Sequence, residues 1–189
     1  MPEGSFASPR DRRDKEDAGR ASGLKPSRDS AGAVTRSTFT YEPDPEFPGW
    51  HTWKLDNGAR FNSLGLGRMI VRREGERFSR VRLVHTEERH SNVHGNVHGG
   101  VTMALIDVAM FAAMFTVLGT DAAGAVTLDL HNQFIGAARI GRPLDIVTEV
   151  VKETRRLVFL RGTAEQEDHL VASFMGTLRK PSSPVEHAR

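Results

Sequence analysis

The chain of 189 residues contains no cysteine. Disulfide bonds, thiol nucleophiles and zinc sites built from cysteine are therefore excluded. The chain also has almost no excess of charge of one sign, since 26 basic and 24 acidic residues leave a formal net charge of +2. No lysine- or arginine-rich run is long enough to form a nucleic-acid patch, so we expect no nucleic acid partner.

Long apolar runs are missing too, with one partial exception. A membrane helix needs about 20 mainly apolar residues, and only segment 99–118 approaches this length, where Asp107 interrupts it. The first residues, Met1, Pro2 and Glu3, do not begin the apolar core of a signal peptide. We therefore expect a cytoplasmic protein without a membrane partner.

Composition divides the chain into three parts. Residues 1–45 are rich in Ser, Gly, Ala, Pro and charges of both signs. Such a segment cannot bury enough apolar surface to offset the entropy lost on ordering, so we predict a disordered N-terminal tail. Residues 46–180 are predicted to form one domain, and residues 181–189 a loose C-terminal tail.

The clearest predicted element is a helix over residues 99–118. Apolar side chains recur there at helical spacing, and methionines occupy much of the opposite side. A helix that is apolar almost all round is expected to be buried on all sides. Two strands are predicted before it, at 68–73 and 78–85, with a hairpin turn between them.

Four more strands are predicted after the helix, at 125–134, 144–152, 157–165 and 170–179. Their connections are short, which favours antiparallel pairing. One helix that is apolar all round needs a sheet wrapped about it. The pattern therefore predicts an α+β fold in which an antiparallel sheet surrounds one long central helix.

Asp107 is the charged residue inside this apolar helix, between Met103 and Phe111 and on the side of Met110 and Met114. An ionised carboxylate in dry apolar surroundings is costly unless it is paired. Desolvation also raises the pKa of a carboxyl towards values useful for a general base. Asp107 alone is consistent with a catalytic base and with a buried carboxylate satisfied by hydrogen bonds or a salt bridge.

The segment before the helix adds a second signal, because it reads NVHGNVHGG from Asn92 to Gly100. Two glycines at a helix start expose backbone N–H groups without obstruction by a Cβ atom. The partial positive charge of a helix N-terminus suits polarising a carbonyl and holding an oxyanion. Asp107 lies about two turns further on, too far from the Gly99 N–H for direct contact, so a substrate or a neighbouring chain must bridge them.

These residues form a pattern that resembles a known signature: Asn92, Gly95, His98-Gly99-Gly100 and Leu105-Ile106-Asp107. It resembles that of the hotdog-fold acyl-CoA thioesterases, most of all the branch containing the phenylacetate-pathway thioesterase. The likeness extends over about residues 64–180. It implies a hotdog fold and hydrolysis of an acyl-CoA thioester to the free acid and CoA.

The resemblance also implies roles for single residues. Asp107 is implied to be the general base that activates water, or else a nucleophile, while Asn92 positions water or the thioester. The Gly99 N–H, with Gly100, is implied to polarise the thioester carbonyl, and His98 beside them to contact the thioester. Thr127 is implied to orient the water from across a dimer interface.

Such sites are built from two chains, so the resemblance implies a homodimer or homotetramer. The phosphates of CoA need basic partners, for which Arg155 and Arg156 are candidates. No cofactor is expected. No metal is expected either, since the spacing of His90, His94 and His98 is not completed by an acidic ligand.

Two alternatives stay open at this point. One is a non-catalytic hotdog protein that binds acyl-CoA, and the other is a hotdog hydratase or dehydratase, which relies on a catalytic histidine in a different motif. The constellation from Asn92 to Asp107 favours hydrolysis over hydration or dehydration, and the non-catalytic alternative stays open.

Overall fold

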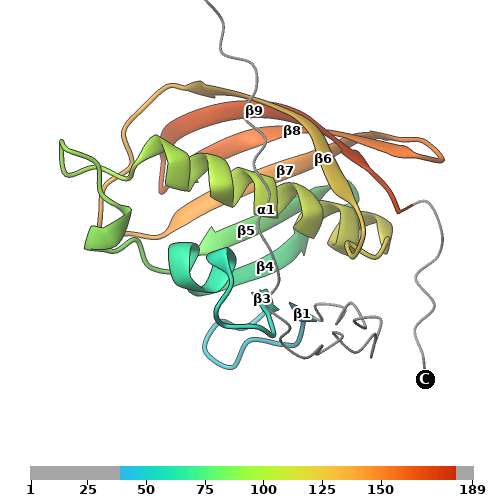
Figure 1. Ribbon diagram of the computed structural model, residues 1–189, viewed down its shortest axis with the longest axis horizontal. Coiled ribbons are helices and arrows are strands. Elements are labelled where there is room, and N and C mark those ends of the chain that lie inside the picture. Colours follow the sequence, from blue (N-terminus) through green and yellow to red (C-terminus); the bar gives the residue numbers. More distant parts are fainter. Residues whose placement is uncertain (1–38, 182–189) are drawn as a thin grey trace, which may run out of the picture. The chain divides into compact units, whose positions relative to one another are not determined.

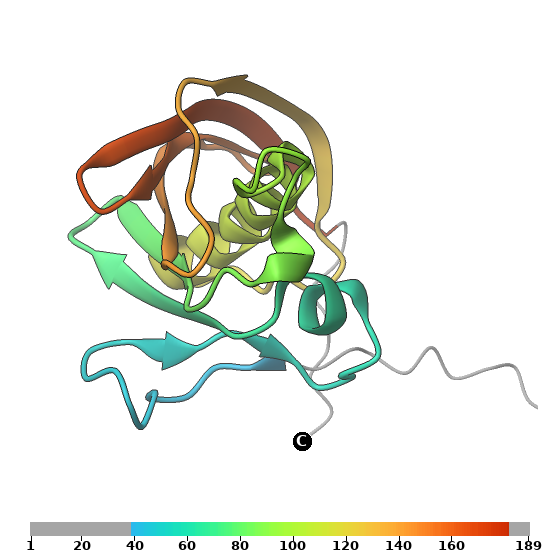
Figure 2. The ribbon, with the colours of Figure 1, turned by 90° about the vertical axis from the view of Figure 1, so that its left-hand side faces the viewer.

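The computed structural model describes residues 39–181, in which an antiparallel sheet curls around one long helix, α1 (Gly99–Leu118) (Figures 1 and 2). The sheet has the strand order β2-β4-β5-β7-β8-β9-β6 and every neighbouring pair is antiparallel. Its strands are β2 (His51–Thr52), β4 (Met69–Glu74), β5 (Phe78–Leu83), β6 (Val126–Phe134), β7 (Leu144–Glu153), β8 (Leu157–Gln166) and β9 (His169–Arg179).

Three smaller elements precede α1 in the chain. A short two-stranded sheet pairs β1 (Phe39–Thr40) with β3 (Lys54–Leu55). A π-helical turn (Asn62–Leu66) precedes β4, and a 3-10 turn (Glu88–His90) precedes the loop that leads into α1.

The predicted fold class, the central helix and the six predicted strands are confirmed. The helix begins and ends where the periodicity places it. His98 caps its N-terminus, and Gly119 ends it in the left-handed conformation at φ 65°. These local signals are strong because both ends of the helix are marked by residues suited to capping.

The core lies between α1 and the concave face of the sheet. Leu105, Ile106, Met110 and Met114 of α1 are fully buried, and the helix packs chiefly on β4, β5 and β7. By length and composition α1 is apolar enough to cross a membrane, but here it is the core helix of the sheet.

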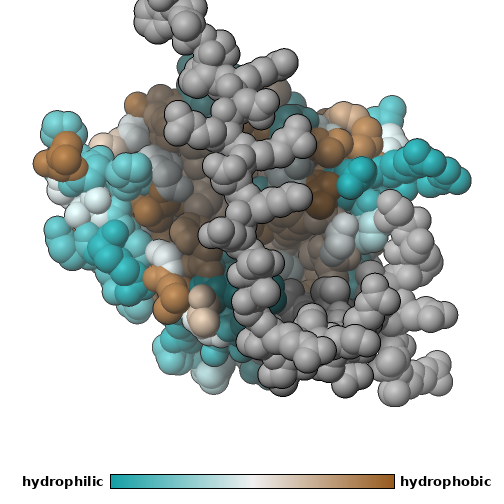
Figure 3. All heavy atoms as spheres, viewed as in Figure 1, coloured by the Kyte–Doolittle hydropathy of each residue, from teal (hydrophilic) through white to brown (hydrophobic). Residues whose placement is uncertain are grey.

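The prediction that α1 is buried on all sides is wrong for a single chain. Met103 is 39% exposed, and Asp107 and Phe111 are only partly buried. The reason is geometric, because the sheet curls around only part of the helix (Figure 2). The strip of α1 that carries these three residues therefore stays partly open in one chain. Figure 3 shows hydrophobic side chains gathered around α1 on this face.

The predicted boundary of the N-terminal tail is also wrong where the structure describes it. Phe39 packs on Trp53 and Phe115, with ring centroids 4.8 and 5.0 Å apart. The buried carboxylate of Asp44 forms a salt bridge of 2.9 Å with Arg68. Residues 39–45 thus belong to the ordered domain, whereas the rest of the predicted tails, residues 1–38 and 182–189, lies outside the described residues.

Candidate active site

The N-terminus of α1 is organised by its capping residue. The Nδ1 atom of His98 accepts a hydrogen bond of 2.9 Å from the Gly100 N–H. This bond commits the Gly100 N–H, so the role predicted for it in polarising a carbonyl does not fit the geometry. The Gly99 N–H is the donor left at the start of the first turn, where no intrahelical partner exists.

Gly99 is also a position that tolerates no larger side chain without movement. A Cβ atom added there would lie 2.9 Å from the Phe134 ring of β6. The absence of a side chain lets the aromatic ring and the helix start approach closely, and it leaves the Gly99 N–H unobstructed.

Asn92 holds the loop in front of this helix end. Its Oδ1 atom accepts hydrogen bonds from the N–H groups of His94, at 2.8 Å, and Asn96, at 3.2 Å. Its NH2 group is therefore the part suited to donate to a bound molecule. Asn92, Gly99 and Phe134 line one pocket of about 400 Å³, so the structure brings the predicted Asn92 and Gly99 together.

A buried histidine, His90, forms hydrogen bonds that hold the same loop in place. The Nδ1 atom of His90 accepts from the Glu87 N–H, its Nε2 atom lies 2.9 Å from the Gly65 carbonyl, and its own carbonyl accepts from the His98 N–H. Both ring nitrogens are occupied, which gives His90 a structural role.

Asp107 is paired with Thr127. The Thr127 hydroxyl donates a hydrogen bond of 2.6 Å to Asp107 Oδ1 within the same chain. Thr127 therefore does not reach Asp107 from across a subunit interface, and this expectation is corrected. The surroundings of Asp107 also differ from the prediction, because Met110 and Met114 are fully buried while Asp107 is partly open.

A second pocket, of about 190 Å³, is lined in part by Asp107. Its walls come from α1, from residues between Phe39 and Met69, and from the loop before β6. Gly99 and Asp107 lie eight residues apart on α1, or about 12 Å along its axis. The predicted site residues of one chain thus fall into two groups that line different pockets.

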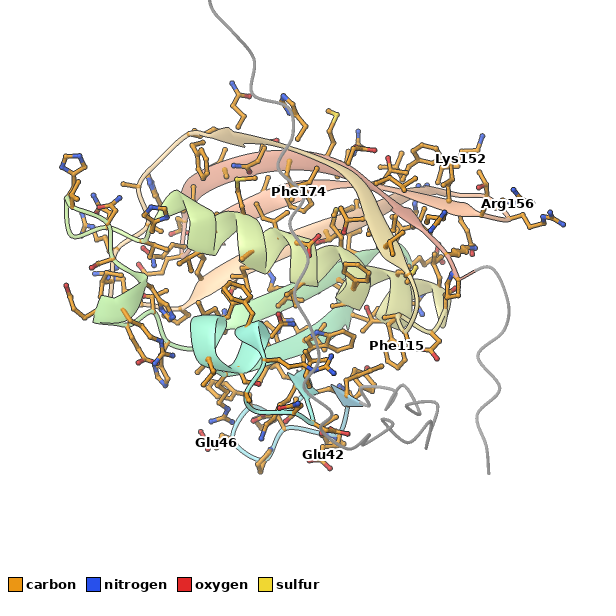
Figure 4. All side chains as sticks on the ribbon, viewed as in Figure 1. Glu42, Glu46, Phe115, Lys152, Arg156 and Phe174 are labelled. Atoms are coloured by element: carbon orange, nitrogen blue, oxygen red, sulfur yellow. The ribbon has the colours of Figure 1, made fainter. Side chains whose placement is uncertain are left out.

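Arg155 and Arg156 belong to neither group. They lie in the turn between β7 and β8, where Arg156 projects from the hairpin end remote from the start of α1 (Figure 4). The structure does not bring them to Gly99 within one chain.

A basic residue that the sequence reasoning missed lies closer. Arg139 lines a cavity of about 650 Å³ that shares Asn96 and Ala137 with the Gly99 pocket. No motif marks Arg139, because its proximity to Gly99 depends on the path of the chain after β6.

Comparisons with known proteins support the fold class. Residues 94–173 match the family model described as the thioesterase superfamily. Among solved structures, zebra fish thioesterase superfamily member 2 is 25% identical, with a TM-score of 0.57 over 66% of this chain and 88% of that chain. A mutant of the phenylacetic acid degradation protein PaaI from Thermus thermophilus is 27% identical, with a TM-score of 0.53 over 62% of this chain and 96% of that chain.

The chain resembles the hotdog-fold thioesterases. A conserved protein from Pseudomonas aeruginosa is also similar, at 27% identity and a TM-score of 0.55 over 64% of this chain and 94% of that chain. Among curated proteins, no sequence matches. The thioesterase family match includes Gly99, Asp107 and Thr127, whereas Asn92 and the pocket walls from residues 39–69 precede it.

Proposed function

We propose that the protein hydrolyses an acyl-CoA thioester to the free acid and CoA. The observation that carries this proposal is the Asp107 carboxylate, which accepts a hydrogen bond from Thr127. Asp107 lines one pocket, and Gly99, the first residue of the same helix, lines another. The matches to thioesterases support the same reaction class.

The reaction needs a base and an electrophilic group, and these residues can supply both. Asp107 removes a proton from water as the water oxygen attacks the thioester carbonyl carbon. The Gly99 N–H donates to the carbonyl oxygen, on which negative charge develops. The C–S bond then breaks, and the CoA thiolate leaves and takes up the proton that Asp107 accepted.

A complete site requires two chains. One thioester carbonyl cannot lie against Asp107 and Gly99 of the same helix, because they are about 12 Å apart. A second copy of the chain that places its Gly99 near Asp107 satisfies both contacts. We therefore propose a homodimer or a homotetramer.

Two surface features support this assembly. β6 is an edge strand with an unpaired side, and Val126 and Leu128 on it are 39% and 52% exposed. An open edge carrying exposed apolar side chains is suited to pairing with another chain. Covering it would also cover the open strip of α1 around Met103 and Asp107.

The CoA body is proposed to lie on the side of the Gly99 pocket. Arg139 is a basic residue in the cavity adjoining that pocket and is suited to contact a phosphate. Arg155 and Arg156 could serve this purpose only if the second chain brought their hairpin to the site.

Replacement of Asp107 by Asn tests the proposal. This variant keeps the size of the side chain but removes the basic carboxylate, so kcat should fall by roughly 10²–10⁴-fold with a smaller change in KM. Release of free thiol from a panel of acyl-CoA substrates measures the rate, on protein whose folding is verified by circular dichroism.

The matched control is Asp129→Asn, which removes an exposed carboxylate from β6 near Thr127. This control should keep wild-type turnover. Folded Asp107→Asn protein with near-wild-type kcat would remove Asp107 from the mechanism, and wild-type protein that binds acyl-CoA without releasing thiol would identify a binding protein instead.

A further inference from the structure

The pocket beside Asp107 has the composition of a site for a small apolar group. Trp53, Met69 and Val108 on its walls are buried, and Phe39 and Phe111 are partly buried. Asp107 is among its lining residues. A ligand whose apolar part enters this pocket therefore has its polar end close to the proposed base.

The outer wall comes from a segment that the thioesterase family match does not include. β1 and β3 pair with each other and contribute Phe39 and Leu55 to the pocket. Trp53 and Phe115 of α1 are in contact, with ring centroids 5.7 Å apart, and Phe39 contacts both rings, tilted against Trp53 and edge-on to Phe115. Aromatic contacts of this kind give the wall a fixed position relative to Asp107.

The size of the pocket limits what it can hold. Pockets for drug-sized ligands usually have volumes of about 300–1,000 Å³, whereas this pocket has about 190 Å³. One water molecule occupies about 30 Å³ of liquid, and a methylene group is of similar size, so the pocket holds roughly six such groups.

We infer that the acyl group of the substrate enters this pocket, and that the β1–β3 wall restricts the enzyme to short acyl groups of roughly six carbons or one small ring. This inference rests on the proposed thioester hydrolysis, because it takes Asp107 as the group next to the carbonyl. Leu55, Phe39 and Trp53 then determine substrate length without taking part in the chemistry.

A series of straight-chain acyl-CoA substrates from two to sixteen carbons tests the inference in the full-length protein. For the wild type, kcat/KM should rise about fourfold for each added methylene until the pocket is full, at roughly six carbons, and then stop rising or fall.

Two variants should move this limit in opposite directions. Leu55→Ala enlarges the pocket and should shift the best chain length upward by about two or three carbons. Ala123→Leu fills the pocket from the loop before β6 and should shift it downward. Leu170→Ala, which truncates a leucine that is 39% exposed on β9 and does not line this pocket, is the control that should leave the profile unchanged.

The outcomes separate the inference from the proposed reaction. If thiol is released but long chains are best, or neither pocket variant changes the profile, the acyl group binds elsewhere and the inference is overturned. If no substrate in the series is hydrolysed, the proposed reaction fails, and calorimetric binding of the same series then tests the pocket. Affinity that improves up to roughly six carbons and shifts with Leu55→Ala supports it, and affinity that ignores chain length overturns it.

Discussion

Mixing two inactive variants tests whether each active site is made from two chains. Gly99 and Asn92 line one pocket and Asp107 lines another, about 12 Å further along α1. If a site combines the Asn92 pocket of one chain with Asp107 of its partner, an Asn92→Ala chain and an Asp107→Asn chain complement each other. One site of the mixed dimer carries both substitutions, while the other carries neither.

The expected turnover rate of the mixed dimer follows from this count of intact sites. Asn92→Ala alone should lower kcat by roughly 10–100-fold, because it misplaces the reacting groups but keeps the base. Asp107→Asn alone should lower it by roughly 10²–10⁴-fold. Mixed dimers, isolated through a different affinity tag on each chain, should recover about half of the wild-type rate, since one of two equivalent sites is intact.

A second mixture provides the internal control. Thr127 donates to Asp107 of its own chain, so mixed dimers of Thr127→Val and Asp107→Asn chains contain no intact site. Their rate should be about half that of the Thr127→Val protein. The two-chain site is refuted if the Asn92 and Asp107 mixture shows only the average rate of its parents, because each site would then lie within one chain.

The remaining predictions concern the contacts of Thr127 and Asp44. Thr127→Val removes the hydroxyl at nearly constant volume and should lower kcat by roughly tenfold, since a hydrogen bond to a charged group contributes about 1.5–3 kcal/mol and this one is only partly buried. Thr127→Ser keeps the hydroxyl and should restore most of the rate. An unchanged rate for Thr127→Val would show that the pair is only structural. Burial raises the pKa of Asp44, but hydrogen bonds from Arg68, the Glu46 N–H and Thr52, with the charge of Arg68, outweigh it and hold that pKa below its ordinary value of 3.8. A depressed pKa in the folded state means that the stabilisation is present above the ordinary value and is lost as the pH falls through the lower one. The loss of stability with falling pH, followed by circular dichroism, should therefore be less steep below about pH 4 for Asp44→Asn than for the wild type. The control Glu46→Gln changes an exposed partner of Arg68 and should retain the wild-type profile. Identical profiles for all three proteins would contradict the role of Asp44.

Local signals in the sequence were sufficient for the main elements. The apolar periodicity predicted α1 at Gly99–Leu118, and short connections predicted the antiparallel sheet. Asp107 and Gly99 could be singled out as candidates from a carboxylate in an apolar helix and a glycine at a helix start, whereas their roles were implied only by the family resemblance. Such features depend on neighbours within a few residues, so the sequence records them directly.

Contacts between distant segments could not be predicted in this way. Leu128 is an extra residue in β6 opposite β9, and this bulge sets which side chains of the strand face α1. Thr127 therefore meets Asp107 in its own chain, a pairing that no local pattern specifies.

The ordered start of the domain at residues 39–45 escaped prediction for a similar reason. Phe39 gains its burial from Trp53 and Phe115, which lie 14 and 76 residues further along the chain. Composition alone made this segment look like part of the tail. The sequence by itself predicted the helix, the strands and the candidate residues. The tertiary structure decided how they are placed, because packing between distant residues depends on register and shape that local composition does not encode.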